Sequence, residues 1–339
     1  MYTNYKIDRI VDESATIKSF YLKPDNGLAI PYFIPGQFVN VKLNSVGENE
    51  FIRSYTLSDS PNKDYLRLTI KQEPKGKSSS YFHNMSAVGD VISLSKPMGN
   101  FNLNTQSCSP VVLLSAGVGI TPMISFVEYI LENQPNREVH FLHSSRNDNV
   151  QPMLNRLKQI KTSCSNFRLT IFHSLPLDHE ILDKHYHYKG RISKSFLSKL
   201  NKEVNYYICG PMEYIESITG FLKDLGVPKN QQFFEYFNKK LKGRSNIELD
   251  ENTNKGYKIT LLKSKKEMTW YQSKTTLLEI CESIGLTPSN SCRMGTCSTC
   301  ETKIIKGAVK YDPEPFMDVS EGNVLICCAI PTSDIEIEL

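Results

Sequence analysis

The sequence lacks the features that mark nucleic-acid-binding and secreted proteins. Its formal net charge is only +4 and no block of lysine and arginine stands out, whereas a nucleic-acid partner usually requires a concentrated basic patch. Residues 1–14 contain neither a long apolar core nor a small-residue cleavage site, so we expect a strand there and not a signal peptide. No internal repeat is visible. These absences lead us to expect a cytoplasmic protein without a nucleic-acid partner.

Long apolar runs are also scarce, and one stretch alone raises the question of a membrane span. Val111–Leu131 is 21 residues long and largely apolar, which is enough to cross a bilayer. It contains Gly117, Gly119, Pro122 and Glu128, and it divides naturally into a short strand, a glycine turn and a helix. We therefore predict a buried strand–turn–helix here and no membrane span.

A chain of 339 residues is too long for one ordinary core and suggests two or three domains. Residues 1–105 show short alternating runs separated by turn residues, a pattern typical of an antiparallel β-barrel or sandwich, of which we predict the barrel. Residues 106–240 alternate strand and helix patterns, which predicts an α/β domain with a parallel sheet. Residues 241–255 are polar and aperiodic and are predicted to be a linker, after which residues 256–339 resume strand and helix patterns. Helices of the α/β domain are predicted over Pro122–Glu132, Pro152–Ile160, Ser193–Leu200 and Glu213–Leu225.

The strongest local signal is a group of cysteines. Cys292, Cys297 and Cys300 have the Cys-x4-Cys-x2-Cys spacing of plant-type [2Fe–2S] ligands, for which a fourth cysteine is expected far downstream. Thiolates suit ferric and ferrous iron, and Gly295 permits a tight turn in the loop between them. The alternative is a structural zinc site, but zinc ribbons normally pair two Cys-x2-Cys knuckles and this segment has one. We therefore predict an iron–sulfur site.

A second motif lies in the predicted barrel. Arg53-Ser-Tyr55-Thr56 follows a strand-like run, and Gly76 and Ser79 lie in a small-residue turn that opens a helix. The free N–H groups of a helix N-terminus bind anions, so an arginine beside that terminus could hold a dinucleotide pyrophosphate. By itself the first tetrapeptide is weak, and a surface strand with a half-buried aromatic is the simpler alternative.

A third motif follows the apolar strand Val111–Leu114. Gly117 and Gly119 allow a tight turn and close backbone approach to a pyrophosphate. We predict Thr121 as the N-cap of the next helix and Pro122 as its first residue. The proline stands where the dinucleotide-binding fingerprint Gly-x-Gly-x-x-Gly has its third glycine.

Together these motifs resemble the ferredoxin–NADP⁺ reductase superfamily, and in particular its members with a C-terminal plant-type ferredoxin domain. The resemblance covers essentially the whole chain and implies a β-grasp fold for residues 256–339. It implies that Arg53 grips a flavin phosphate, that Tyr55 stacks on the isoalloxazine, and that the Thr56 hydroxyl bonds near flavin N5. Gly76 and Ser79 match the second flavin motif of the family, Gly-x-x-Ser.

Two further segments are similar to motifs of this family. Cys209-Gly210-Pro211 resembles its Cys-Gly-Pro motif, in which the cysteine lies beside the nicotinamide C4. Glu235 and Phe237 resemble its Glu-x-Phe motif, in which the aromatic covers the flavin until nicotinamide displaces it. The plainer alternative for Cys209 is a small buried residue, and for Phe237 it is core packing.

The resemblance also bears on which cofactors bind. Pro97-Met-Gly99-Asn-Phe101 is similar to the segment of FAD-binding members, whereas FMN-binding relatives more often have Arg-Asn in place of Met-Gly, so FAD is expected rather than FMN. NADPH-selective relatives often place Ser-Arg after the third strand, where this sequence has Ser174-Leu175. We therefore expect NADH, although Arg146 could contact the ribose or its phosphate and keeps NADPH as the alternative.

The fourth cluster ligand is ambiguous because Cys327 and Cys328 are adjacent. Leu325-Ile-Cys-Cys-Ala-Ile-Pro331 resembles the ferredoxin ending Leu-x-Cys-x-x-x-Pro, and that alignment selects Cys327.

The implied function is a reductase that passes hydride from NADH to FAD and then single electrons through the cluster to a protein acceptor. That acceptor is expected to be an oxygenase, a hydroxylase or another metalloprotein. The residues expected to act in catalysis are Thr56, Cys209, Glu235 and Phe237. Two alternatives remain open, namely a stand-alone reductase of quinones, nitro compounds or ferric chelates, and a non-catalytic redox sensor.

Overall fold

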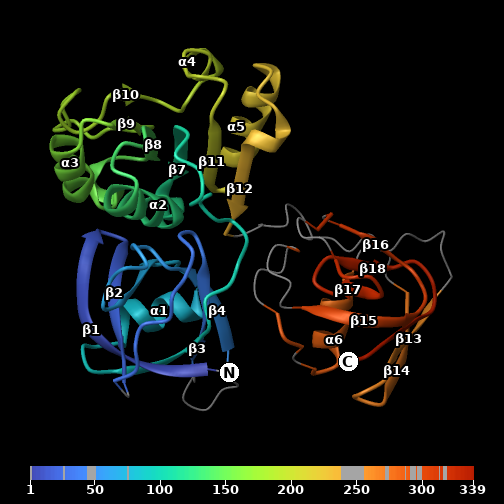
Figure 1. The fold of residues 1–339 in the computed structure, drawn as a ribbon. Coiled ribbons are helices and arrows are strands. Elements are labelled where there is room, and N and C mark those ends of the chain that lie inside the picture. Colours follow the sequence, from blue (N-terminus) through green and yellow to red (C-terminus); the bar gives the residue numbers. More distant parts are fainter. Residues whose placement is uncertain are drawn as a thin grey trace. The chain divides into compact units, whose positions relative to one another are not determined.

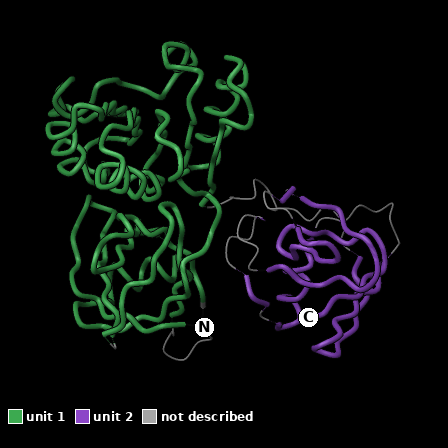
Figure 2. Tube along the Cα trace, in the orientation of Figure 1, with its two compact units in different colours: residues 1–238 green, residues 239–339 purple. Residues whose placement is uncertain are grey.

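The computed structural model forms two compact units, residues 1–238 and residues 239–339 (Figure 2). It describes residues 2–25, 27–43, 51–74, 76–237, 256–271, 275–286, 288–290, 295, 300–312, 314–315 and 319–339. The predicted linker at 241–255 and two predicted cluster ligands, Cys292 and Cys297, lie outside the described residues.

The first part of unit 1 is a six-stranded antiparallel barrel with one helix (Figure 1). Its strands are arranged in the order β4-β3-β6-β1-β2-β5, and a bridge between Leu57 and Leu68 joins the two ends. Alternation along each strand points one set of apolar side chains inward, where Phe20, Val39 and Ile92 are almost fully buried. The elements are β1 (Tyr2–Ser14), β2 (Ile17–Pro24), β3 (Phe38–Leu43), β4 (Phe51–Thr56), β5 (Leu66–Lys71), α1 (Lys77–Asn84) and β6 (Val91–Ser95).

The second part of unit 1 is a six-stranded parallel sheet in the order β10-β9-β8-β7-β11-β12. One face packs on α2 and α3 and the other on α4 and α5, as expected for strands that read as continuous apolar runs. In Figure 1, α2 lies on the side of the sheet that faces the barrel. The elements are β7 (Val111–Ala116), α2 (Ile120–Asn133), β8 (Val139–Ser145), α3 (Leu154–Ser163), β9 (Phe167–His173), β10 (Tyr188–Lys189), α4 (Lys194–Leu197), β11 (Asn205–Gly210), α5 (Met212–Asp224) and β12 (Gln232–Tyr236).

Val111–Leu131 folds as the predicted strand, glycine turn and helix, but the predicted start of the helix is wrong. A 3-10 turn at Gly117–Gly119 runs directly into α2, so the helix begins at Ile120 and its N-cap is Gly119. Thr121 therefore lies inside the first turn, where its hydroxyl donates to the Val118 carbonyl at 3.1 Å. Across the described residues, every helix is too short or too polar to span a bilayer.

Two other helices differ from the prediction at their ends. The helix predicted over Ser193–Leu200 spans only Lys194–Leu197, and the Ser193 hydroxyl caps it by accepting the Phe196 N–H. The helix predicted over Pro152–Ile160 runs over Leu154–Ser163 instead, because Met153 adopts a left-handed conformation (φ +54°) that starts it later.

The described residues of unit 2 form a five-stranded mixed sheet in the order β14-β13-β19-β15-β17, a separate β16–β18 pair and one helix. This α+β arrangement agrees with the fold predicted for residues 256–339. Thr276 and Glu279 form a capping box that starts the helix. The elements are β13 (Tyr257–Leu261), β14 (Lys266–Trp270), α6 (Leu277–Ser283), β15 (Glu301–Lys306), β16 (Val309–Tyr311), β17 (Asn323–Leu325), β18 (Ala329–Pro331) and β19 (Ile335–Ile337).

Candidate active site and cluster site

Strand β4 and helix α1 meet at Tyr55. The hydroxyls of Tyr55 and Ser78 are 2.7 Å apart, and the Phe82 ring meets the Tyr55 ring edge-on with centroids 5.6 Å apart. Both contacts come from α1, so they join the strand to the first and second turns of the helix. Thr56, the next residue of β4, is 6% exposed. The ring of Tyr55 is thus held in one place with Thr56 beside it and Arg53 two residues earlier on the strand.

The N-terminus of α1 fits a phosphate group. Its N-cap is Gly76, no side chain of the described residues caps it, and its first turn holds no acidic residue. A Cβ on Gly76 would lie 2.5 Å from Ser79 Oγ, and Ser79 in turn accepts the Glu73 N–H at 3.0 Å. Ser79 therefore shapes the turn. Arg53 is exposed and donates to the Ile52 carbonyl at 2.7 Å. A helix N-terminus and a guanidinium suit the pyrophosphate of FAD.

The glycine turn after β7 passes very close to the end of β11. Gly117 has φ +54°, a conformation that favours glycine. A Cβ on Gly119 would lie 2.3 Å from the carbonyl oxygen of Cys209, so any larger residue would collide with backbone there. α2 follows at once, and its N-terminus has no side-chain cap. This turn has the close backbone approach and open helix end that a dinucleotide pyrophosphate needs.

The turn after β11 lies against the turn after β7. β11 ends at Gly210, and Pro211 is the N-cap of α5. A Cβ on Gly210 would lie 3.0 Å from the Tyr214 ring and 3.1 Å from the Ala116 side chain. Two adjacent glycine-containing turns therefore share the carboxyl edge of the parallel sheet, which is where open α/β sheets bind their ligands.

A row of polar side chains crosses the sheet just below this edge. Parallel pairing sets Glu235, Cys209 and Ser115 opposite one another, and His143 continues the row on β8, 2.6 Å from the Ser115 hydroxyl. Burial, and then the charge of Glu235, raises the pKa of the Cys209 thiol. Burial, and then the nearby His173, lowers the pKa of His143 to about 3. Both groups are therefore neutral at pH 7, so Cys209 stands at the sheet edge as a thiol and not as a thiolate.

Several buried polar atoms near this edge have no partner within the described chain. They are Asn147 Oδ1 and Gln151 Oε1 in the loop after β8 and His173 Nε2 at the end of β9. The other ring nitrogen of His173 bonds to Glu180, which fixes the ring. A buried polar group without a partner is costly, and ligand hydroxyl and amide groups could satisfy these. The residues present therefore fit the adenosine half of a dinucleotide.

Phe237 follows β12 and is half-buried against the core cluster on the α2 and α3 face of the sheet. This contact agrees with the simpler alternative, in which Phe237 only packs in the core. Its role over the flavin stays a prediction.

In unit 2 the described cysteines of the predicted cluster lie in neighbouring segments. Cys300 precedes β15 and Cys327 lies between β17 and β18, and both are nearly buried. The N–H of Gly295 donates to Cys327 Sγ at 3.3 Å, the kind of bond that tunes a cluster. Cys328 instead donates its thiol to the Leu325 carbonyl at 3.4 Å. These contacts suit Cys327 as the fourth ligand.

Three family models match the chain in the predicted order. The oxidoreductase FAD-binding domain matches residues 5–103, the oxidoreductase NAD-binding domain matches residues 113–219, and the 2Fe-2S iron-sulfur cluster binding domain matches residues 259–332. The chain belongs to the ferredoxin reductase-type flavoproteins with a C-terminal [2Fe–2S] domain. The cofactors of this reductase are FAD, NADH and a [2Fe–2S] cluster, as predicted.

Individual relatives cover the reductase to different extents. A flavohemoprotein of Bacillus cereus is 36% identical over 244 residues, which are 70% of this chain but 61% of that protein. The FAD/NAD-binding domain of a nitric oxide dioxygenase from Vibrio cholerae is 28% identical with a TM-score of 0.62, over 69% of this chain and 98% of that one. A phthalate dioxygenase reductase shares the fold over 100% of this chain and 98% of its own, with 21% identity and a TM-score of 0.65.

The sequence motifs did not point to three residues of the site. Ser78 holds Tyr55, and its signal was the helix-opening run of three serines that follows Gly76 and Lys77. Ser115 and His143 form a hydrogen bond below the nucleotide edge. The signal for Ser115 was a polar residue near the carboxyl end of an apolar strand, whereas the strand of His143 holds several polar residues and gives no such signal.

Proposed function

We propose that this reductase transfers hydride from NADH to FAD and delivers the electrons singly, through its [2Fe–2S] cluster, to a protein acceptor. The observation that carries this proposal is that the flavin strand β4 and the nicotinamide turn before α2 belong to one compact unit. When bound, flavin accepts an electron pair as hydride and can release electrons one at a time, which suits a one-electron cluster. Each NADH would thus become NAD⁺ and a proton, and reduce two one-electron acceptors.

On the flavin side, three residues of β4 have distinct tasks in this proposal. Arg53 and the N-terminus of α1 hold the pyrophosphate. Tyr55, fixed by Ser78, presents its ring as a flat support. Thr56 offers a nearly buried hydroxyl as a hydrogen-bonding group beside the reacting edge.

On the nicotinamide side, backbone and neutral side chains do the positioning. Gly117 and Gly119 let the chain approach the pyrophosphate. Cys209, with Glu235 beside it, lines the sheet edge as an uncharged thiol. Phe237 excludes water until nicotinamide takes its place. Holding the two reactants together in a dry site provides the rate enhancement, because hydride transfer needs no protein nucleophile.

The choice of NADH over NADPH rests on the loop after β9. Leu175 is exposed, and its N–H donates to the Arg146 carbonyl at 2.8 Å, so Leu175 stands beside the backbone of Arg146. A leucine cannot bind a 2′-phosphate, whereas a guanidinium at that position would. The exposed side chain of Arg146 is the reason to test NADPH in parallel.

An oxygenase component is the first acceptor to test, since the fold is shared from end to end with a phthalate dioxygenase reductase. The chain spans about 61% of the length of the curated flavohemoproteins that it matches, so their printed name supports only the reductase part.

The decisive experiment is an anaerobic titration of the purified protein with NADH. We expect NADH to bleach the flavin absorbance and to produce the electron paramagnetic resonance signal of a reduced [2Fe–2S] centre. Steady-state rates should then be compared for oxygenase components, quinones, nitro compounds and ferric chelates. Fastest turnover with a small molecule would favour a stand-alone reductase. If NADH does not bleach the flavin, the non-catalytic redox sensor would be the remaining alternative.

A further inference from the structure

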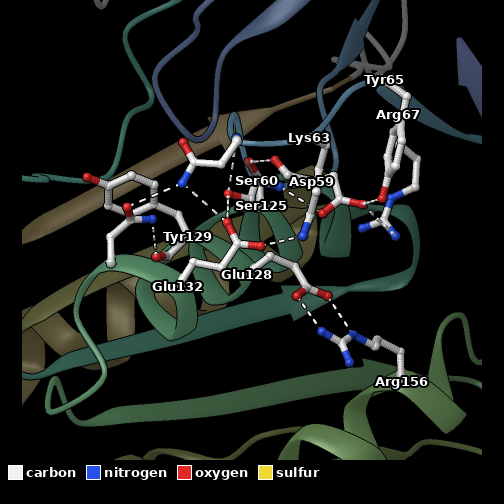
Figure 3. A network of polar contacts seen from close by, with 12 residues as sticks. Asp59, Ser60, Lys63, Tyr65, Arg67, Ser125, Glu128, Tyr129, Glu132 and Arg156 are labelled. Atoms are coloured by element: carbon white, nitrogen blue, oxygen red, sulfur yellow. Dashed lines mark hydrogen bonds and ion pairs between the residues drawn. The ribbon is translucent and has the colours of Figure 1, made fainter. Parts of the chain in front are cut away.

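Helix α2 touches the barrel as well as the nucleotide edge. Its first residue follows the glycine turn, while a residue of its last turn, Glu132, reaches the loop between β4 and β5. Glu132 accepts hydrogen bonds from the Ser60 hydroxyl at 2.5 Å and from Lys63 Nζ, and Asn62 Nδ2 approaches at 3.3 Å. Figure 3 shows Lys63 and Ser60 pointing toward Glu132. We call Ser60, Lys63 and Glu132 the α2 clamp.

The barrel end of the α2 clamp is rigidly braced. Asp59 forms a buried ion pair with Arg67 at 3.2 Å, with the two side chains 5% and 7% exposed, and accepts the Tyr65 hydroxyl at 3.0 Å (Figure 3). The backbone carbonyl of Asp59 also accepts the Ser125 hydroxyl of α2 at 2.7 Å. Asp59 lies three residues after Thr56, so the loop that meets α2 is continuous with the flavin strand.

The helix end of the α2 clamp is braced as well. Ser125, Glu128 and Glu132 are spaced three and then four residues apart and so share one face of α2. Glu128 is 4% exposed and pairs with Arg156 of α3 at 2.7 Å (Figure 3). That pair holds α2 to the rest of the nicotinamide domain, so a displacement of Glu132 would displace the helix as a body.

Two of the three clamp residues, Lys63 and Glu132, are charged and only partly buried, whereas Ser60 is neutral and fully buried. Lys63 and Glu132 side chains are 30% and 29% exposed. Burial raises the pKa of Glu132, but the bonds from Lys63 and Ser60 outweigh it and leave the pKa below its usual value. Burial lowers the pKa of Lys63, but Glu132 outweighs it and leaves that pKa raised. Partly exposed pairs add little to the free energy of unfolding. The role of this pair is therefore to fix the position of α2.

We infer that the α2 clamp positions the nicotinamide domain on the flavin domain, with Glu132 and Lys63 as positioning residues for hydride transfer. The inference rests on the proposed hydride transfer between the two domains. The clamp fixes the C-terminal end of α2, and the N-terminal end of the same rigid helix carries the pyrophosphate turn. Because hydride transfer depends steeply on the distance and alignment of donor and acceptor, a loosened clamp should slow the transfer without weakening NADH binding.

The test uses Lys63→Met, Glu132→Gln and the double variant in the full-length holoprotein. Stopped-flow reduction of the flavin by NADH gives a limiting rate and an apparent dissociation constant. Each single variant should lower the limiting rate by about tenfold at an unchanged dissociation constant. The double variant should be no slower than either single one, because both remove the same ion pair. Lys63→Arg should keep the rate.

Hydrogen exchange of the amides in the last two turns of α2 provides a readout that does not depend on turnover. It should speed up in the three clamp variants and stay normal in Lys63→Arg. The matched control is Lys194→Met, which breaks the exposed 2.8 Å pair of Lys194 and Asp224 between α4 and α5, away from the barrel. It should change neither readout.

Faster exchange with an unchanged limiting rate would overturn the positioning role while leaving the proposed function intact. Unchanged exchange in all variants would overturn the clamp itself. Failure of the unmodified protein to bleach its flavin with NADH is a separate result, and it would refute the proposed function.

Discussion

The two compact units of the molecule carry different chemistry in their side chains. All seven histidines lie in residues 1–238, at positions 83, 140, 143, 173, 179, 185 and 187, and none lies in residues 239–339. Cysteines are distributed in the opposite way, with Cys108, Cys164 and Cys209 in unit 1 and the other six of nine in unit 2. In the proposed sites, unit 1 would bind its dinucleotides mainly through backbone turns, with Arg53 and neutral side chains around them, whereas unit 2 would bind its metal cluster through thiolates.

This difference predicts which kind of substitution should damage the site in each unit. Removing one covalent ligand should destroy a cluster outright, while a dinucleotide site built from turns should fail by degrees, through steric and positional changes. It also predicts that damage in one unit leaves the half-reaction of the other unaffected.

The largest effect is expected from substitutions at the adjacent cysteines of unit 2, Cys327 and Cys328. Cys327→Ser should abolish the visible absorption of the cluster and the transfer of electrons to a one-electron acceptor, because it removes a thiolate ligand. Flavin reduction by NADH should continue at the normal rate. Cys328→Ser is the matched control, since serine can still donate to the Leu325 carbonyl. Absorption and electron paramagnetic resonance spectra check both, and loss of the cluster only in Cys328→Ser would reverse the ligand assignment.

The next largest effect is expected where the two glycine-containing turns of unit 1, after β7 and after β11, lie against each other. Gly119→Ala would place a Cβ 2.3 Å from the Cys209 carbonyl oxygen, so the turn must shift. We expect a loss of about 1–3 kcal/mol in the free energy of unfolding together with weaker NADH binding, measured by urea unfolding and by titration.

Gly220→Ala in α5 is the control for that substitution, because nothing lies within 4 Å of the added atom. It should be neutral, or stabilise the helix by up to about 1 kcal/mol. If both variants bind NADH normally, the close approach at Gly119 has no functional meaning.

A smaller effect is expected on stability at low pH, which should differ between the two units. The folded protein keeps the pKa of His143 at about 3, mainly by burial, whereas an unfolded histidine titrates near about 6.5. As pH falls below about 6.5, the unfolded chain binds a proton at His143 that folded unit 1 excludes, so this residue alone costs unit 1 roughly 1 kcal/mol per pH unit down to about pH 3. Unit 2 has no histidine and should not share this slope.

Two optical signals separate the units in that measurement. The only tryptophan, Trp270, lies in β14 and reports on unit 2, while release of fluorescent flavin reports on unit 1. Urea midpoints at pH 7, 6 and 5 should fall for flavin release and stay nearly level for Trp270. His143→Gln should reduce the slope of the flavin signal without removing it, because burial also lowers the pKa of His140 to about 4. Equal slopes for both signals would contradict a histidine origin.

The sequence predicted what depends on local spacing and missed what depends on docking. The glycine turn, the strand that carries Tyr55 and the cysteine spacing are each visible within about ten residues of chain. The contact of Ser60 and Lys63 with Glu132 joins segments about 70 residues apart. The periodicity of neither segment predicts this contact. The start of α2 was missed because a 3-10 turn at the glycines leads straight into the helix.

The smallest effect tests whether Phe237 does more than pack. Phe237→Ala should alter the rate at which nicotinamide exchanges at the flavin, measured as flavin reduction at several NADH and NAD⁺ concentrations. Phe233→Ala is the control, because Phe233 lies on β12, just before Phe237, but stacks on Tyr207 at 4.9 Å and so reports packing alone. Similar stability losses with a kinetic change only in Phe237→Ala would assign the ring to the active site. If both variants exchange nicotinamide at the normal rate, Phe237 belongs to the core, and exclusion of water falls to the buried row of Cys209, Ser115 and His143.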